Sequence, residues 1–348
     1  MAGAKFSRRY HSPWSSFRTT IYTLQLHVCT RRMFFQSRRY ALAGKLLNLN
    51  DNSITPFMKS VPETRFFSTK QTLNLNGRLL DFTTPKIMGV LNVTPDSFFD
   101  GGRYDSDDTI ITQVEKMVQE GADFIDVGGY SSRPGAEDVP QHEETKRVSR
   151  AIRLITTRFP DTLISIDTFR SEVAYAAIQE GACIINDISS GELDTNMIAT
   201  VARLNVPYIA MHMRGNPMNM SQHTTYENLV KEIADFFHHK VSELHAHGVK
   251  DIILDPGFGF SKTVDQNFEL LNRLDYFKIL GKPVMVGLSR KSMIWKTLAI
   301  NPEDALNGTT ALNTVALLKG VSILRVHDVK PAVEAVKLVS RLKDKMPD

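Results

Sequence analysis

Eight short apolar runs with roughly even spacing place the strongest constraint on the fold of this chain. Five of them, 87–92, 124–127, 163–167, 184–187 and 252–255, stop at a polar or turn residue, and the other three are 208–211, 283–287 and 322–326. Each run has the length of a fully buried strand, and the stretches between them are long enough for crossover helices. Repeated strand–helix units predict a parallel sheet, and such sheets carry their active sites at the carboxyl ends of the strands. The polar strand ends therefore indicate an enzyme.

The segments between the runs decide how the sheet is arranged. Amphipathic stretches that predict helices occupy 109–120, 143–158, 170–180, 226–246 and 331–345. Gly121, Gly181 and Gly248 follow three of them and suit the left-handed residue that ends a helix. Eight βα units in about 280 residues predict a (β/α)₈ TIM barrel. An open doubly wound sheet is the alternative, but it gives no reason for eight units of nearly equal length.

The amino-terminal segment has a different composition from the rest. Residues 1–50 contain nine Lys and Arg residues and no Asp or Glu, interleaved with Ser, Thr, Tyr and Phe. The segment has no long apolar core, which argues against a secretory signal or an anchor and is typical of an organellar transit peptide. Arg65 shortly precedes Ser68, as at a processing site. We expect residues 1–67 to be a disordered mitochondrial leader and 68–348 the barrel. A disordered extension or a misplaced start codon, with a cytoplasmic protein, is the alternative.

Without its leader, the chain is mildly acidic. Residues 68–348 hold 31 basic and 36 acidic side chains, a net charge of about −5, so the sequence pI of 8.9 comes mainly from the first 67 residues. A nucleic-acid partner would need a basic face, and we expect none. The barrel also lacks an apolar run long enough to span a bilayer, so we expect no membrane partner. Cys183 is its one cysteine, which suits a reducing compartment.

Short motifs follow the predicted strands in order. They are Asn92-Val93-Thr94-Pro95-Asp96, Asp126-Val127-Gly128-Gly129, Ser165-Ile166-Asp167-Thr168, Ile185-Asn186-Asp187, Met211-His212-Met213-Arg214-Gly215, Asp255-Pro256-Gly257-Phe258-Gly259-Phe260, Gly287-Leu288-Ser289-Arg290-Lys291-Ser292 and Arg325-Val326-His327-Asp328. The ordered set closely resembles the dihydropteroate synthase family of pterin-binding barrels. The resemblance covers about residues 70–345, and each of the eight motifs by itself would be a weak signal.

The resemblance implies a pterin site formed by Asp167, Asn186, Asp255 and Lys291. A pterin is a flat heterocycle with donors and acceptors along one edge, so acids that accept N–H bonds and an amide that does both suit it. Helix N-capping is the alternative role for each aspartate, because Asp is favoured just before a helix. Convergence of the acids and the amide with a lysine favours the site.

The resemblance also implies a diphosphate site formed by Arg325, His327 and Asn92. Arg325 and His327 are two apart on the last strand, so both side chains point the same way. The guanidinium supplies forked donors for phosphate oxygens. In the family, Asn92 matches the position that binds Mg²⁺, an ion that prefers few protein ligands plus substrate phosphates. An ion pair with Asp328 or a helix carboxyl end is the alternative role for Arg325.

The resemblance further implies a p-aminobenzoate site. It is formed by Ser132, Arg133 and Pro134 on one loop, together with Phe260 and Ser292. In the family, loops matching 94–103 and 131–140 close over the site and exclude water. The chain departs from the usual family pattern at three positions: Tyr130 instead of an acid, Ser132 instead of threonine, and Ser261 instead of a glycine. None of these removes a charged catalytic group.

The resemblance implies a homodimeric transferase of folate biosynthesis that joins p-aminobenzoate to a dihydropterin diphosphate, with Mg²⁺. Its expected catalytic residues are Lys291, Asp167, Asp255, Arg325 and His327. A pterin-binding methyltransferase of the corrinoid type shares the Asp/Asn/Asp pocket, but it does not need Arg325, Lys291 or the Asn92 loop. A binding protein on an inactive barrel would have lost Lys291, Arg325 or His327, and all three are present.

Overall fold

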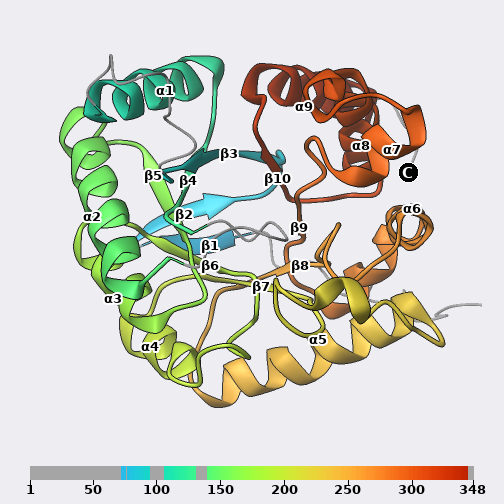
Figure 1. Ribbon diagram of the computed structural model, residues 1–348, viewed down its shortest axis with the longest axis horizontal. Coiled ribbons are helices and arrows are strands. Elements are labelled where there is room, and N and C mark those ends of the chain that lie inside the picture. The colour runs from blue at the N-terminus through green and yellow to red at the C-terminus, as the bar shows by residue number, and fades with distance from the viewer. Residues whose placement is uncertain (1–71, 76, 95–105, 131–138, 344–348) are drawn as a thin grey trace, which may run out of the picture. The chain divides into compact units, whose positions relative to one another are not determined.

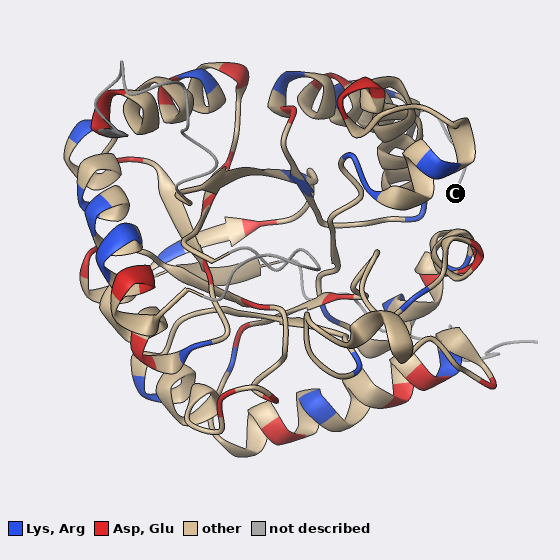
Figure 2. Ribbon diagram, viewed as in Figure 1, with Lys and Arg blue, Asp and Glu red and all other residues tan. Residues whose placement is uncertain are grey.

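The computed structural model describes residues 72–75, 77–94, 106–130 and 139–343, all within the unit Arg65–Asp348 (Figure 1). Strands lie at the centre and helices surround them (Figure 1). In these described ranges, every helix is too short or too polar to cross a bilayer. Lys and Arg positions and Asp and Glu positions are both present on the outer helices, and further charged positions lie on the strands and loops inside the ring (Figure 2).

Eight strands form one parallel sheet in the order β8-β7-β6-β5-β4-β3-β10-β9. They are β3 (Lys86–Asn92), β4 (Phe124–Gly128), β5 (Leu163–Asp167), β6 (Ile184–Asp187), β7 (Tyr208–Met211), β8 (Ile252–Asp255), β9 (Met285–Val286) and β10 (Ile323–Val326). The two edges meet at a parallel bridge between Leu254 and Val284, where the Leu254 amide donates to the Pro283 carbonyl at 2.9 Å. The predicted (β/α)₈ barrel is therefore confirmed.

The closing strand is the one that differs most from expectation. The apolar run 283–287 predicts a five-residue strand, but β9 is regular only at Met285 and Val286. Pro283 has no N–H group to donate to a neighbouring strand, so the ladder cannot extend through it. The barrel is consequently joined by few backbone hydrogen bonds between β8 and β9.

The helices cover the outside of the barrel. They are α1 (Ser106–Glu120), α2 (Gln141–Arg158), α3 (Ser171–Gln179), α4 (Met197–Leu204), α5 (Leu229–Ala246), α6 (Val264–Asn272), α7 (Ser292–Leu298), α8 (Leu306–Leu318) and α9 (Val329–Lys343), with short 3₁₀ turns η2 (Met220–Gln222), η3 (Leu274–Leu280) and η4 (Pro302–Asp304). The five expected ranges correspond to α1, α2, α3, α5 and α9. The sequence analysis gave no ranges for α4, α6, α7 and α8, although eight βα units require further helices; α8 has no charged face to create an amphipathic pattern.

The barrel interior is apolar at its amino end. Phe124 and Ile184 open their strands and point inward, where they share one buried cluster with Leu73. Leu73 belongs to a two-stranded hairpin, β1 (Thr72–Leu75) and β2 (Arg78–Asp81), which the sequence patterns did not reveal. Because the hairpin side chains fill this end of the barrel, the space left for polar chemistry is at the carboxyl ends of the strands.

Candidate active site

A layer of inward-facing polar side chains lies above the apolar layer. Its members come from five strands and are Asp126, Ser165, Asp167, Asn186, Asp255 and Arg325. Strand alternation explains the layer, because residues two apart point to the same face. Asp126 follows the inward Phe124 by two positions, and Asn186 follows the inward Ile184 in the same way. The pleat of the strands thus brings together side chains that are far apart in the sequence.

Arg325 links two carboxylates across the barrel. Its Nε donates to Asp126 Oδ2 at 2.6 Å, and its Nη2 donates to Asp167 Oδ2 at 2.6 Å. Asn186 Nδ2 donates to the same Asp126 oxygen at 3.0 Å. Burial by itself would lower the pKa of the Arg325 guanidinium. The negative charges of Asp126 and Asp167 together have a larger effect, so the pKa is raised. Arg325, which is expected at the diphosphate, therefore touches Asp167, which is expected at the pterin.

Asp126 is a site residue that the sequence reasoning did not single out. Its side chain is fully buried, and its Oδ1 has no hydrogen-bond partner among the described residues. A buried carboxylate oxygen without a donor is costly, so it is a natural place for a ligand N–H group or an ordered water molecule. In the sequence it is a single acid in the middle of an apolar run, and its inward direction follows only once the structure shows that Phe124, two positions earlier, faces the barrel interior.

Asp167 and Asn92 lie on either side of Gly128. These three residues occupy one row across β5, β4 and β3. A Cβ atom on Gly128 would lie 3.6 Å from both Asn92 Oδ1 and Asp167 Oδ2, so the glycine leaves the space between them open. Burial raises the pKa of Asp167 to about 7, although the Arg325 guanidinium acts in the opposite direction. This carboxyl group therefore titrates near neutral pH.

Lys291 and Asp255 form the opposite side of the layer. Burial lowers the pKa of Lys291 to about 8, with Asp255 acting against that change. Asp255 is 6% exposed, its pKa is raised by burial, and its Oδ1 accepts from the Gly257 amide at 2.8 Å. Lys291 Nζ lies 4.5 Å from the centroid of the Phe260 ring, a cation–π contact. Phe260 and Lys291, expected at different substrates, are thus neighbours.

The remaining expected residues lie at the rim or outside the described part of the chain. β10 ends at Val326, so His327 is beyond the strand; it is exposed, and its Nδ1 lies 3.2 Å from Ser289 Oγ. Ser292 opens α7 and is half-buried. Ser132, Arg133 and Pro134, together with most of the loop 94–103, lie outside the described residues.

The alternative role for Arg325 as the partner of Asp328 is wrong. Asp328 instead accepts two hydrogen bonds from Arg290, from Nε and Nη2, each at 2.9 Å. Arg325 is consequently turned into the barrel, where it contacts the two buried acids. In the described ranges, His, Cys, Asp and Glu side chains form no group of three or more that is arranged to hold a metal ion.

Together, these groups favour a planar ligand that carries N–H donors and an anionic substituent. The acids and Asn186 can accept or donate along the edge of a heterocycle. Arg325, which contacts two of these acids, is a cation that can pair with a negative charge on the ligand. Lys291, with a pKa of about 8, is a donor that keeps its charge at neutral pH.

Comparisons with known proteins agree with this geometry. A family model described as pterin binding enzyme matches residues 88–327. A dihydropteroate synthase of Synechocystis is 45% identical over 259 residues, which cover 74% of this chain and 89% of the relative. Two solved structures of the dihydropteroate synthase of Xanthomonas albilineans are also similar. One, with 4-aminobenzoic acid, has a TM-score of 0.74 at 35% identity and covers 80% of this chain and 99% of that one. The other, with 7,8-dihydropteroate, has a TM-score of 0.72 at 34% identity and covers 79% and 100%.

Proposed function

Because this chain belongs to the pterin-binding enzymes, within the dihydropteroate synthases, we propose that the polar layer around Arg325 is the place where its two substrates meet. The enzyme is a transferase of folate biosynthesis. It condenses p-aminobenzoate with (7,8-dihydropterin-6-yl)methyl diphosphate to give 7,8-dihydropteroate and diphosphate. The observation that supports this assignment of the site most directly is the paired contact of Arg325 with Asp126 and Asp167 at the carboxyl ends of the strands.

The pterin binds to Asp167, Asn186, Asp255 and Lys291 in this proposal. The Asn186 amide nitrogen is held by Asp126, so its Oδ1 faces away from that bond and is left to accept a hydrogen bond from the pterin edge. Asp255 is oriented by the Gly257 amide, and Lys291 lies close to it. A heterocycle between these groups would satisfy buried polar atoms that otherwise require water.

Arg325, His327 and Asn92 hold the diphosphate. Arg325 lies in the barrel and His327 at its rim, so the leaving group would extend from the pterin toward the mouth. Asn92 offers a hard amide oxygen beside Asp167, which suits Mg²⁺ when substrate oxygens supply the other ligands. When bound, the ion would neutralise charge on the diphosphate. We propose that Mg²⁺ arrives with this substrate.

p-Aminobenzoate binds beside the Phe260 ring and near Ser292, with Ser132, Arg133 and Pro134 contributing from their loop. The 4.5 Å contact between Lys291 and Phe260 supports this placement, because it puts the aromatic wall next to the pterin residues. An aryl amine between them would be close to the pterin methylene group. Proximity of this kind supplies much of the rate in a two-substrate reaction.

The reaction is a substitution at the pterin methylene carbon. The C–O bond to the diphosphate breaks and its electron pair leaves on the diphosphate oxygen. The lone pair of the amine nitrogen forms the new C–N bond, and the nitrogen then loses a proton to water. The aromatic amine is neutral near pH 7, so its lone pair is free without prior deprotonation. Asp167 and Asp255 stabilise positive charge on the pterin, while Arg325 stabilises negative charge on the leaving group.

The test is release of diphosphate by the purified full chain and by residues 68–348, supplied with both substrates and Mg²⁺. We expect release that depends on p-aminobenzoate, stops after chelation and returns with added Mg²⁺. If diphosphate is released at the same rate without p-aminobenzoate, the transferase assignment of the site is rejected. If chelation has no effect, the role proposed for Asn92 with Mg²⁺ is rejected.

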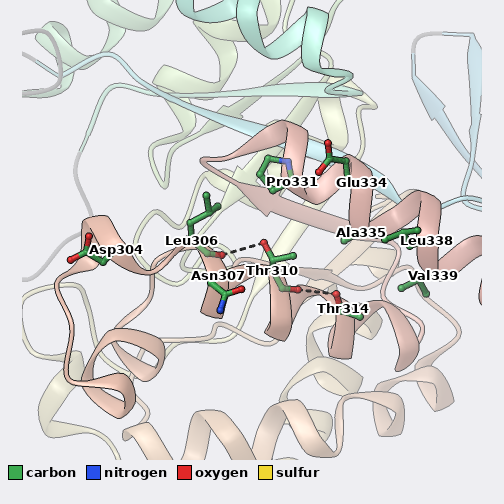
Figure 3. Close-up of a pocket in the computed structure, with 10 residues that line it drawn as sticks. All are labelled: Asp304, Leu306, Asn307, Thr310, Thr314, Pro331, Glu334, Ala335, Leu338 and Val339. Atoms are coloured by element: carbon green, nitrogen blue, oxygen red, sulfur yellow. Dashed lines mark hydrogen bonds between the residues drawn. The ribbon is translucent and has the colours of Figure 1, made fainter.

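We also propose that the enzyme is a homodimer joined through α8 and α9. A groove between these helices is lined by residues such as Leu306, Thr310 and Leu338 (Figure 3). Leu338 is 73% exposed, and α8 carries no charged residue. Exposed apolar surface of this kind is typical of an interface, and a second copy can cover it by two-fold symmetry.

Leu338→Glu is therefore expected to shift the enzyme from dimer to monomer in sedimentation velocity, because it places a charge in the proposed contact. Leu79→Glu is the matched control, since Leu79 on β2 is also 73% exposed. The control should sediment like the wild type. A monomeric wild type, or a Leu338→Glu variant that remains dimeric, would exclude this interface.

We propose, finally, that residues 1–67 direct the enzyme into mitochondria. Residues 1–50 contain nine basic residues and no acidic one, which is typical of a mitochondrial leader and supports the proposal. A fluorescent reporter fused to residues 1–67 is expected to colocalise with mitochondria and to lose that location when the nine are changed to glutamine. A reporter that stays diffuse in the cytosol would contradict the proposal.

A further inference from the structure

A buried lysine other than Lys291 lies close to the site, and the reaction described above does not use it. Lys262 is 8% exposed, and its ammonium group lies 3.1 Å from His212 Nδ1, 3.0 Å from the Gly257 carbonyl oxygen and 3.0 Å from the Phe260 carbonyl oxygen. Lys262 donates to the two carbonyl oxygens, and the neutral imidazole of His212 can accept a third N–H bond in the tautomer that is protonated at Nε2. The His212 carbonyl oxygen is also near, at 3.5 Å. Burial lowers the pKa of Lys262 to about 7, while Asp255 acts in the opposite direction.

The acceptors tie together two loops at the carboxyl end of the barrel. His212 directly follows β7, whereas Gly257 and Phe260 belong to the segment 256–263 between β8 and α6. The two chains pass so closely that a Cβ on Gly257 would lie 2.1 Å from the His212 carbonyl oxygen. Ser261 adds two further links: its hydroxyl accepts from the Arg214 amide at 2.9 Å, and its carbonyl accepts from the Tyr226 hydroxyl at 3.0 Å.

The segment that Lys262 holds carries two contacts of the active site. The Gly257 amide donates to Asp255 Oδ1, and the Phe260 ring faces Lys291 Nζ. A Cβ on Gly259 would lie 3.0 Å from Lys291 Cδ, so the same segment limits where the Lys291 side chain can lie. A change in this loop would consequently move Asp255 and Lys291 together, on the side of the pocket opposite Asp167.

We propose that Lys262 is a positioning residue, whose ammonium group fastens segment 256–261 to the end of β7 and so sets the orientation of Asp255 and Lys291 toward the pterin. The proposal rests on the proposed function of that site. Lys262 itself does not touch the substrate. It acts through the carbonyl groups of Gly257 and Phe260, and catalytic groups must be held by such supporting contacts to keep their geometry.

Lys262→Met fills the same space but removes all three donors, which leaves buried acceptors unpaired. We expect kcat/KM for the pterin diphosphate to fall roughly 10- to 100-fold, as for other small displacements of catalytic groups. Lys262→Gln keeps two N–H donors and should retain an intermediate activity. The amides of Gly257 and Gly259 should also exchange hydrogen faster in Lys262→Met, because the loop that carries them is less firmly held.

Lys240→Met is the matched control. Lys240 is 6% exposed on α5, on the outside of the barrel, where it pairs with Glu192 and Glu243. A purely structural role for Lys262 predicts that both Met variants lose thermal stability and keep kcat/KM near that of the wild type below the melting temperature. The positioning role predicts that only the Lys262 variants lose kcat/KM and loop protection.

The two measurements, kcat/KM and hydrogen exchange, test this proposal separately from the proposed function. If the wild type releases no diphosphate in the presence of both substrates, the function is rejected and hydrogen exchange alone decides on Lys262. Faster exchange at residues 256–261 in Lys262→Met, but not in Lys240→Met, supports the fastening role. Unchanged exchange together with unchanged kcat/KM overturns it, and so does a Lys262→Gln variant that is no better than Lys262→Met.

Discussion

Arg325→Met is expected to lower kcat/KM by about 2–5 kcal/mol in transition-state free energy, or roughly 30- to 5,000-fold, as when one member of a desolvated charge pair is removed. The guanidinium is the partner of both Asp126 and Asp167, at 2.6 Å each. Methionine leaves these carboxylates close together without a counter-charge, and it removes the cation proposed to stabilise the departing diphosphate. Both kcat and substrate affinity should therefore fall.

The contact with Asp167 adds a second expectation for the same variant. A pterin without the diphosphate should also bind more weakly to Arg325→Met, since Asp167 loses its partner, but the diphosphate ester should lose more affinity. Paired calorimetry with the two ligands measures the difference. Equal losses would mean that Arg325 only supports the pterin pocket. Arg153→Ala, which breaks an exposed ion pair with Glu180 on the outside of the barrel, should leave both affinities unchanged.

Asp167→Asn is expected to weaken pterin binding by about 1.5–3 kcal/mol, the usual range for a hydrogen bond to a charged group. The amide keeps the shape of the side chain but loses its negative charge. Burial raises the pKa of Asp167 to about 7 in the free enzyme, and a bound pterin that donates N–H bonds favours the ionised form. Binding therefore releases a proton below that pH, so wild-type affinity should increase as the pH rises through about 7.

The variant should show a smaller pH dependence than the wild type between about pH 6 and pH 8, because position 167 no longer titrates there. Lys291, whose pKa is lowered by burial to about 8, would account for what remains. Calorimetric titration of both proteins over this range measures the effect. Asp123→Asn, at the opposite end of the strands, is the matched control. If Asp167→Asn turns over at the wild-type rate, Asp167 is not a pterin ligand.

The strands could be predicted from sequence because each is buried and therefore consists mainly of a short run of apolar residues. The runs 163–167, 184–187, 208–211 and 252–255 agree residue for residue with β5, β6, β7 and β8. Helices with one apolar face were also found. α8 was not, because its uncharged sequence gives no amphipathic period. The hairpin β1–β2 was not found either, because only its packing under Met88 and Phe124 makes Leu73 and Leu75 part of the core.

Only some of the residues of the candidate site could be predicted from the sequence in the same way. Reading the strand ends identified Asp167, Asn186 and Asp255, since a polar residue there stands out against its apolar neighbours. Asp126 was missed because it lies inside a strand, where a single acid is ambiguous until the inward face is known. Lys262 was missed because two of its three partners are backbone carbonyls, which leave no pattern in the sequence, and the third, His212, lies 50 positions earlier in the chain.

The sequence by itself determined the barrel, the polar strand ends and the family to which the chain belongs, because strand length, alternation and motif order are all properties of neighbouring residues. Only the tertiary structure decided that Arg325 pairs with Asp126 and Asp167 and leaves Asp328 to Arg290. Closing the ring places β10 across the barrel from residues more than 150 positions earlier in the chain. The choice of partner then depends on distance and burial in three dimensions, and the order of residues along the chain contains neither.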